Sequence, residues 1–380
     1  MYERSDGNQA TSRGRLEFLD GLRAGAAWFV VVHHAWLGAF GTFPENTGPW
    51  AVGWLRWGHL PVSLFIVISG FSLTLAPSRN DDRTTAGAAD FFRRRAVRIV
   101  PPYWAALAVS CLTIILYTGK HSEFYVTAKT VVVYGLLLQD TFEAPVPNGA
   151  FWSIAVEWHI YFFFPLLLWM TRRWGQRWMV AATTVAVVGI YVAATEVGGF
   201  FEKFLRFSPQ YLLLFVFGVV AARALRSSAV RPGAAPVTAV VGSIAVLLLL
   251  CLGSPSSLVE QFFWVDLAFG FVCAVWLFAM ATGSFPRASA VLSLRPMVWL
   301  GRFSYSTYLI HVPVLGVTHF AVALPVGGTK LQEFLILVLV GLPATLVASY
   351  VLYQFVERPS AERTSTLGRK WVEANLARVR

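Results

Sequence analysis

The sequence carries little charge for its length. Only 13% of its 380 residues are Asp, Glu, Lys or Arg, whereas a soluble globular domain carries about 25%. Hydrophobic types make up 56% and aromatic types 15%, which excludes both a soluble globular enzyme and a disordered chain. The 31 Lys and Arg outnumber the 20 Asp and Glu, for a net charge of +11. In so apolar a chain this excess is typical of cytoplasmic loops of a membrane protein, and no nucleic-acid partner is expected.

Cysteine is scarce as well. Cys111, Cys251 and Cys273 each lie in an apolar run, and none has a partner at the spacing of a metal or redox motif. We expect all three to be buried apolar side chains. The sequence therefore predicts no disulfide framework and no metal site.

Apolar runs long enough to cross a bilayer dominate the chain. Before the first run, the N-terminal 20 residues are polar and lack the short apolar core of a cleavable signal peptide. The predicted spans number about ten, at 22–40, 58–77, 101–119, 151–170, 178–196, 207–223, 237–253, 263–282, 303–324 and 334–356.

Basic residues cluster in every second connection between these runs. Six arginines follow the run 58–77, whereas the connection before 334–356 holds only Lys330. This alternation places both termini in the cytoplasm. The short apolar stretch Val131–Leu138 is too short to span, and we interpret it as a re-entrant or surface helix.

The predicted fold is therefore all-α, a polytopic membrane helix bundle. We divide the chain into a cytoplasmic tail (1–20), a transmembrane domain (21–358) and a basic cytoplasmic tail (359–380). Since the chain ends soon after the last run, no appended soluble domain is expected.

Placing an ionisable side chain within a membrane span costs free energy, so each such residue is a candidate functional residue. Arg23 and His34 in the first run are 11 residues apart, so they share a helix face about 16 Å apart along the axis. His33 points about 100° away, which makes a His–His metal pair a weak alternative. A snorkelling arginine and a packed histidine are the structural alternative.

Two further groups lie near the predicted inner face. Ser69 and Gly70 end the second run, where small residues let helices approach closely. Arg95 and Arg98 share one face of a predicted amphipathic helix on the inner membrane surface. They either set topology and bind anionic lipid, or clamp a phosphate through their guanidinium groups.

The fourth and ninth runs contain polar residues of their own. Glu157 lies below the predicted outer surface and needs a cationic or hydrogen-bonding partner. It could bind an acceptor, tune a histidine or form a structural ion pair. Tyr305 begins the ninth run at the inner face, and His311 follows at mid-depth before Pro313. His311 could equally be a packed core histidine.

Together these residues place cations inside, a histidine at mid-membrane and a carboxylate toward the outside. This arrangement suits a donor such as coenzyme A, with its phosphates inside and a thin arm reaching His34. His34 could act as general base on a hydroxyl or carry the acyl group itself. The alternative is a transporter or flippase for a polar or lipid-linked glycan, although no paired interrupted spans are visible.

The motifs together resemble the acyltransferase 3 family of integral-membrane O-acyltransferases, from about Leu19 to Pro359. The stretches that carry the resemblance are Leu19-Asp20-Gly21-Leu22-Arg23 through His34, Ser69-Gly70-Phe71, Arg95 to Arg98 with Pro101, Trp152-Ser153 through Glu157 to Tyr161 and Pro165, Ser304-Tyr305 through Tyr308, His311 and Pro313, and Glu357-Arg358-Pro359.

The resemblance implies transfer of an acyl group, usually acetyl, from cytoplasmic acyl-CoA to a hydroxyl of a cell-surface carbohydrate or a macrolide-like metabolite. It implies a multi-pass protein of the bacterial cell membrane, in contact with lipids and without a metal. Expected site residues are Arg23, His34 and Glu157 for catalysis, Arg95, Arg98, Ser69 and Tyr305 for the donor, and Trp152, Ser153 and His311 for the acceptor.

Three positions depart from the family pattern. Ser63 stands where many relatives have Asp, His33 replaces a common aromatic residue, and His159 replaces a Gln-like position. These departures bear on the identity of the acceptor more than on the reaction. A binding subunit without chemistry is disfavoured, because Arg23, His34 and Glu157 are all present.

Overall fold

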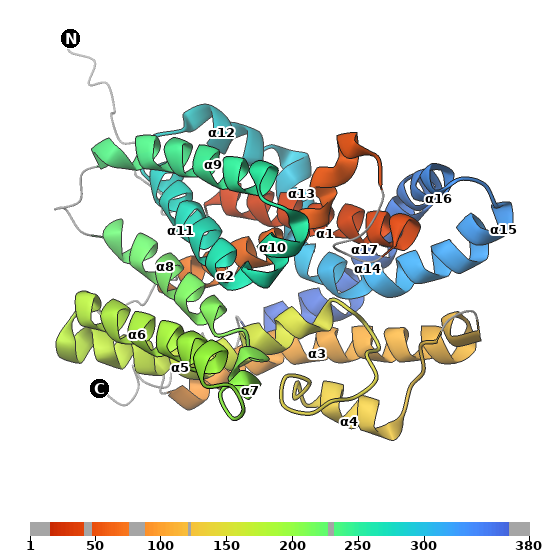
Figure 1. Ribbon diagram of the computed structural model, residues 1–380, viewed down its shortest axis with the longest axis horizontal. Coiled ribbons are helices and arrows are strands. Elements are labelled where there is room, and N and C mark those ends of the chain that lie inside the picture. The colour runs from red at the N-terminus through yellow and green to blue at the C-terminus, as the bar shows by residue number, and fades with distance from the viewer. Residues whose placement is uncertain (1–15, 42–47, 76–87, 121–122, 227–231, 365–380) are drawn as a thin grey trace, which may run out of the picture.

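The computed structural model describes residues 16–41, 48–75, 88–120, 123–226 and 232–364. Within these residues the fold is all-helical and holds no strand, as the composition predicts. Figure 1 shows α9, α11 and α12 along one side of the bundle and α3, α5 and α6 along the other.

Each of the ten predicted runs falls on a helix. The long helices are α1 (Glu17–Phe40), α2 (Leu60–Leu75), α3 (Ala88–Leu116), α5 (Phe151–Trp174), α6 (Gln176–Glu196), α8 (Gln210–Ala224), α9 (Ala235–Leu252), α11 (Phe262–Ala281), α14 (Ser304–Thr318) and α17 (Leu342–Leu352). The short helices are α4 (Ala128–Gly135), α7 (Glu202–Leu205), α10 (Pro255–Glu260), α12 (Pro286–Leu292), α13 (Arg295–Arg302), α15 (Leu324–Val326) and α16 (Lys330–Ile336).

Eight helical segments in the described residues are long and apolar enough to cross a membrane. The last two of them contain π-helical turns, at His319–Ala323, Leu337–Gly341 and Tyr353–Glu357. Two predicted spans, α1 and the 15-residue α8, fall outside the eight. The chain is thus a multi-pass helical membrane protein.

The segment around Arg95 differs from its prediction. Instead of a surface helix followed by a separate span from Pro101, α3 is one helix of 29 residues with Pro101 and Pro102 inside it. Proline removes one N–H donor and crowds the carbonyl four residues earlier, yet a membrane helix can continue through it when neighbouring helices pack against it. Arg95 and Arg98 therefore lie on the same continuous helix as the apolar run that follows them.

The segment between α3 and α5 packs into the bundle. Helix α4 has eight residues and does not span, as predicted. Asn148 is buried, and its Nδ2 donates to the carbonyl oxygen of Leu309 at 3.0 Å and to Ser110 Oγ at 3.2 Å. Since Leu309 lies in the middle of α14, this anchor makes α5 begin deep within the bundle.

Glycine permits the tight packing of α2 against α8. A Cβ on Gly70 would lie 2.1 Å from the carbonyl oxygen of Phe215, and one on Gly218 would lie 2.1 Å from that of Val67. The two backbones thus touch at a pair of small residues, which confirms the packing role expected for Gly70.

Cys111 and Cys273 are buried as expected, but Cys251 is exposed. Cys251 lies on α9, and only 11% of the apolar stretch of that helix is buried within the protein. The expectation of a buried Cys251 is therefore wrong.

The first turns of α1 are held against α12 and α13 in the same way. A Cβ on Gly21 would lie 2.0 Å from the carbonyl oxygen of Leu292, and one on Gly301 would lie 2.0 Å from that of Asp20. Real Cβ atoms do not approach backbone oxygens so closely. These glycines therefore fix where Asp20 and Arg23 stand in the bundle.

Gly21→Ala is expected to destabilise the protein by about 1–3 kcal/mol, because backbone must shift to admit the methyl group. Gly25→Ala is a matched control one turn away on the same helix, where a Cβ meets nothing within 4 Å. Thermal unfolding in detergent should show a lower midpoint for Gly21→Ala alone. Equal midpoints for both variants would show that α1 does not need this contact.

Candidate active site

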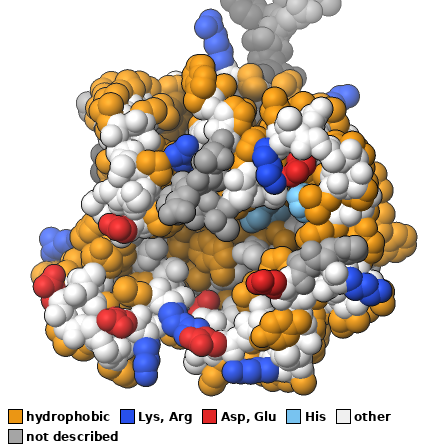
Figure 2. Space-filling view, turned by 45° about the vertical axis from the view of Figure 1, so that its right-hand side comes forward, with side chains coloured by type: hydrophobic (Ala, Val, Ile, Leu, Met, Phe, Trp, Pro, Cys, Tyr) orange, Lys and Arg blue, Asp and Glu red, His pale blue; other side chains and the backbone are white. Residues whose placement is uncertain are grey.

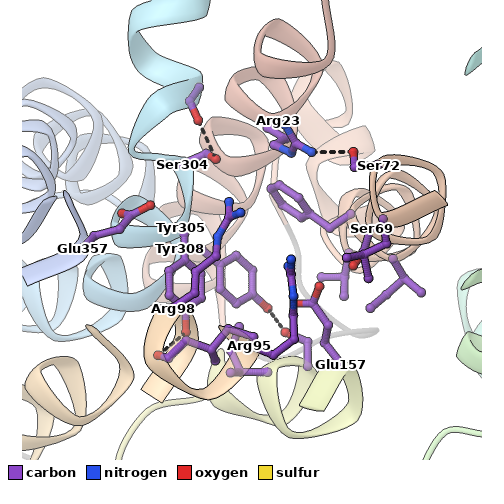
Figure 3. A pocket seen from close by; sticks show the side chains of 18 of the residues that line it. Arg23, Ser69, Ser72, Arg95, Arg98, Glu157, Ser304, Tyr305, Tyr308 and Glu357 are labelled. Atoms are coloured by element: carbon purple, nitrogen blue, oxygen red, sulfur yellow. Dashed lines mark hydrogen bonds between the residues drawn. The ribbon is translucent and has the colours of Figure 1, made fainter. Parts of the chain in front are cut away.

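A cavity of about 300 Å³ opens between α1, α2, α3, α5, α13 and α14. Unlike the surrounding core, its wall is rich in charged and hydroxyl side chains (Figure 3). The polar residues that line it are Asp20, Arg23, Ser69, Ser72, Arg95, Arg98, Ser153, Glu157, Tyr161, Arg302, Ser304, Tyr305, Tyr308 and Glu357. Five of the residues predicted for donor or acceptor binding are therefore in one place: Ser69, Arg95, Arg98, Ser153 and Tyr305.

The arginines of this cavity differ in their partners. Arg23 Nη1 lies 3.1 Å from Asp20 Oδ1, and its Nη2 donates to Ser72 Oγ at 2.8 Å. The Arg95 guanidinium instead lies over the rings of Phe91 and Tyr161, at 5.8 and 5.9 Å from their centroids. Its Nε is buried without a hydrogen-bond partner.

Arg95 and Arg98 reach into the cavity from one face of α3, as their spacing predicts (Figure 3). Within the described part of the chain neither guanidinium forms a salt bridge. Cation–π contacts with Phe91 and Tyr161 hold Arg95 in place without neutralising it. The cavity thus presents guanidinium groups that an anion can bind.

Besides Asp20, which pairs with Arg23, the cavity wall holds two carboxylates, Glu157 and Glu357, and both accept hydrogen bonds from uncharged donors. Tyr161 Oη donates a short hydrogen bond to Glu157 and lies 2.9 Å from Ser69 Oγ. Glu357 accepts from the Ser306 hydroxyl and, at 3.1 Å, from the Ser306 backbone N–H. Glu357 therefore joins the end of the last helical segment to α14, whereas Glu157 bonds Tyr161 of its own helix, whose hydroxyl reaches Ser69 of α2.

The expected position of Glu157, near the outside and apart from the cations, is wrong. Glu157 lines the same cavity as Arg95 and Arg98 (Figure 3). Its depth was misjudged because α5 begins beside the middle of α14 rather than at the membrane surface. Asn148, bonded to the carbonyl oxygen of Leu309, fixes that start.

Aromatic and hydroxyl side chains close the deep end of the cavity. Tyr305 Oη donates to the carbonyl oxygen of Ile99 at 3.0 Å. One turn further along α14, the hydroxyls of Tyr308 and Ser153 are 2.6 Å apart, and the Phe65 ring lies 6.0 Å from that of Tyr308. The ring of His311 is the next beyond Tyr308, at 5.8 Å.

His34 lies beyond this deep end and does not line the cavity. Its ring is half-buried and lies 4.7 Å from that of His311, with 3.2 Å between His34 Nδ1 and His311 Nε2. Arg23 and His34 share a face of α1 but are about 16 Å apart along it. Arg23 therefore lines the cavity, whereas His34 lies outside it.

His33 and His34 turn to different partners, as predicted from their angular separation. His33 Nδ1 lies 2.7 Å from the carbonyl oxygen of Leu55, and its ring packs where a Cβ on Gly58 would clash. The two imidazoles meet edge to face, with centroids 5.0 Å apart. His33 thus ties α1 to the segment before α2.

Trp152, a predicted site residue, lies neither in the cavity wall nor in contact with the histidine pair. Its ring packs against Tyr211 of α8, 5.7 Å between centroids, and is not part of the cavity wall. His159 also faces away from the site, with its Nδ1 3.3 Å from Asp140 Oδ2. Both residues contact the surrounding helices instead.

Some cavity residues were missed by the sequence reasoning. Asp20 and Glu357 were quoted only as parts of motifs, and Arg302 only as part of a basic connection. Glu357 could have been found from the sequence, because a glutamate at the end of an apolar run is a candidate functional residue. The predicted run ended at residue 356, one position too early.

Fold and cavity define a class: a multi-pass membrane protein whose helices enclose a site lined by guanidinium and hydroxyl groups, with the His34–His311 pair beyond its Tyr308 end. The model of the acyltransferase 3 family, described as an acyltransferase domain, matches residues 16–354. The chain belongs to this family, whose description favours acyl transfer over a transporter without chemistry.

Curated relatives give the same class. The chain is 22% identical over 375 residues to the peptidoglycan O-acetyltransferase OatA of Listeria monocytogenes, covering 92% of this chain and 56% of the relative. It is 24% identical over 364 residues to a Staphylococcus aureus protein named as an O-acetyltransferase, covering 90% and 56%. No solved structure matches the chain. The chain thus spans about 56% of the length of these relatives.

Proposed function

We propose that this protein transfers an acetyl group from acyl-CoA to a hydroxyl of a cell-surface glycan, in the bacterial plasma membrane. The observation that carries the proposal is the cavity in which Arg95 and Arg98 lack a salt bridge among the described residues, and whose deep end points to His34 through Tyr308 and His311. The names of the relatives support the acetyl group and the glycan.

The donor would bind with its phosphates at the arginines. Guanidinium binds phosphate through two parallel N–H donors, and Arg95 and Arg98 are one turn apart on α3. Arg23, which Asp20 and Ser72 hold at the same wall, adds a third cation. The uncharged pantetheine arm would then follow Tyr305 and Tyr308 along α14 toward the histidines. Both termini and the mouth of this cavity would face the cytoplasm.

Two mechanisms are open to His34 in this proposal. As general base, His34 takes the proton of the acceptor hydroxyl while its oxygen attacks the thioester carbonyl; the C–S bond breaks, and the imidazolium returns the proton to the thiolate. As acyl carrier, the imidazole attacks the thioester and releases the thiolate. The acceptor oxygen then displaces the imidazole from the acyl carbon, and its proton passes to the thiolate.

The acceptor would approach from the opposite end of the bundle. His34 is half-buried and absent from the wall of the arginine-lined cavity, so in this proposal the acceptor reaches it by a second route. Figure 2 shows a hollow toward the end that carries α4 and the α15–α16 connection, with histidine side chains beside an acidic and a basic one. An acceptor there would meet the donor arm only at the histidine pair.

The acceptor class is tested by incubating the purified protein in detergent with radiolabelled acetyl-CoA. The candidate acceptors are peptidoglycan fragments, a crude envelope extract and a panel of macrolides. The proposal expects label in the glycan fractions. Label in macrolides alone would replace the glycan acceptor, and label in neither, with acetyl-CoA intact, would contradict the proposed function.

A further inference from the structure

The contacts of His311 determine which of its nitrogens carries a proton. His311 is fully buried, and its Nδ1 faces two carbonyl oxygens, those of Thr307 at 3.2 Å and Tyr308 at 2.8 Å. A carbonyl oxygen can only accept, so Nδ1 must be the donor. In the neutral imidazole this leaves Nε2 as an acceptor with a lone pair.

The same reasoning then determines the form of His34. His34 Nδ1 has two neighbours, the carbonyl oxygen of Val30 at 2.9 Å and His311 Nε2 at 3.2 Å. Both are acceptors, so His34 Nδ1 must carry the proton and share it between them. A protonated His311 would not fit, because its Nε2 would donate to a nitrogen that already has to donate to Val30.

The Nε2 atom of His34 is left with a free lone pair. Within the described part of the chain, no group hydrogen-bonds to it. Deprotonated imidazole nitrogen is the form that both a general base and an acyl carrier require.

We infer that His311 is a positioning residue that fixes the tautomer and ring orientation of His34, so that His34 Nε2 is the reacting atom. The inference rests on the proposed role of His34. When Nε2 takes up a proton or an acyl group, the positive imidazole keeps both acceptors on its Nδ1–H, the carbonyl oxygen of Val30 and His311 Nε2. His311 thus performs the orienting task of the third group in a nucleophile–base–orienter array, and not the acceptor binding expected from the sequence.

A merely structural role predicts something different. His311 then only fills space between α1 and α14, and an apolar side chain of similar size would replace it best, because a buried polar group needs partners. The positioning role instead requires an acceptor at the place of Nε2. Glutamine can supply one through its amide oxygen, whereas leucine cannot.

The variants His311→Leu and His311→Gln separate these roles. We expect His311→Leu to lower kcat about 100-fold with unchanged acetyl-CoA affinity, and His311→Gln to recover at least tenfold of that loss. Wild-type turnover in His311→Leu, or a glutamine variant no better than leucine, would overturn the inference.

Nitrogen-15 NMR of the histidine-labelled protein provides a readout that is independent of activity. The His34 signal, assigned by its loss in His34→Ala, should show a proton on Nδ1 and none on Nε2 in wild type. A proton on Nε2 would overturn the inference. If the tautomer is as expected but the protein transfers no acetyl group, the proposed function fails while the positioning role stands.

Discussion

Replacing His34 with alanine is expected to reduce acetyl transfer by at least about 10³-fold and to leave the affinity for acetyl-CoA unchanged. General-base catalysis alone contributes about 10²–10⁴-fold, and the loss is larger if His34 also carries the acyl group. Affinity is preserved because His34 lies outside the donor cavity, beyond Tyr308 and His311. Initial rates and equilibrium binding on the same preparation separate the two effects.

His33→Ala is the matched control for this experiment. It removes the neighbouring imidazole of the same helix, whose Nδ1 contacts the carbonyl oxygen of Leu55 and whose ring meets His34 only edge to face. We expect a lower unfolding temperature but near wild-type transfer by the folded protein. The account would be contradicted if His34→Ala stayed within tenfold of wild type, or if both variants lost transfer equally.

Arg95→Ala and Arg98→Ala are each expected to raise the Kd for acetyl-CoA about 10- to 100-fold. A hydrogen bond to a charged group contributes about 1.5–3 kcal/mol, and these guanidiniums form no salt bridge within the described residues that would have to be broken. The unfolding temperature should change little in Arg98→Ala. It should fall further in Arg95→Ala, because Arg95 packs on Phe91 and Tyr161. Isothermal calorimetry in detergent measures the affinity.

Arg93→Ala is the control, because Arg93 lies on the same helix, pairs with Asp90 at 3.2 Å and is absent from the cavity wall. A truncated thioester donor without phosphates, S-acetyl-N-acetylcysteamine, gives a second control. Its apparent KM should be equal in wild type and in the arginine variants. If Arg95→Ala and Arg98→Ala both bind acetyl-CoA like wild type, these arginines set topology or contact lipid instead.

The helices were predictable because the length of an apolar run in the sequence indicates a membrane-spanning helix. The apolar pattern does not show where a helix starts relative to its neighbours. Glu157 was placed too far out because a polar contact, from Asn148 to the carbonyl oxygen of Leu309, draws the start of α5 inward. The continuity of α3 through Pro101 was missed for a similar reason, since tertiary packing overrides a local helix-breaking signal.

The site was predictable as a set of residues but not as an arrangement. Ser69, Arg95, Arg98, Ser153 and Tyr305 were chosen from motifs, and all line one cavity. The contact between His34 and His311 was not foreseen, because they are 277 positions apart and only the packing of α1 on α14 joins them. Spacing along one helix predicted the shared face of Arg23 and His34, yet it gave no information on what each one faces.

The most direct test of the central claim follows donor and acceptor in one reaction. Purified protein is mixed with radiolabelled acetyl-CoA and peptidoglycan fragments, and both free CoA thiol and labelled glycan are measured over time. The account predicts one thiol released for each acetyl group transferred, with both signals lost in His34→Ala. If acetyl-CoA neither binds nor is cleaved by the wild-type protein, the cavity is not a donor site and the account is wrong.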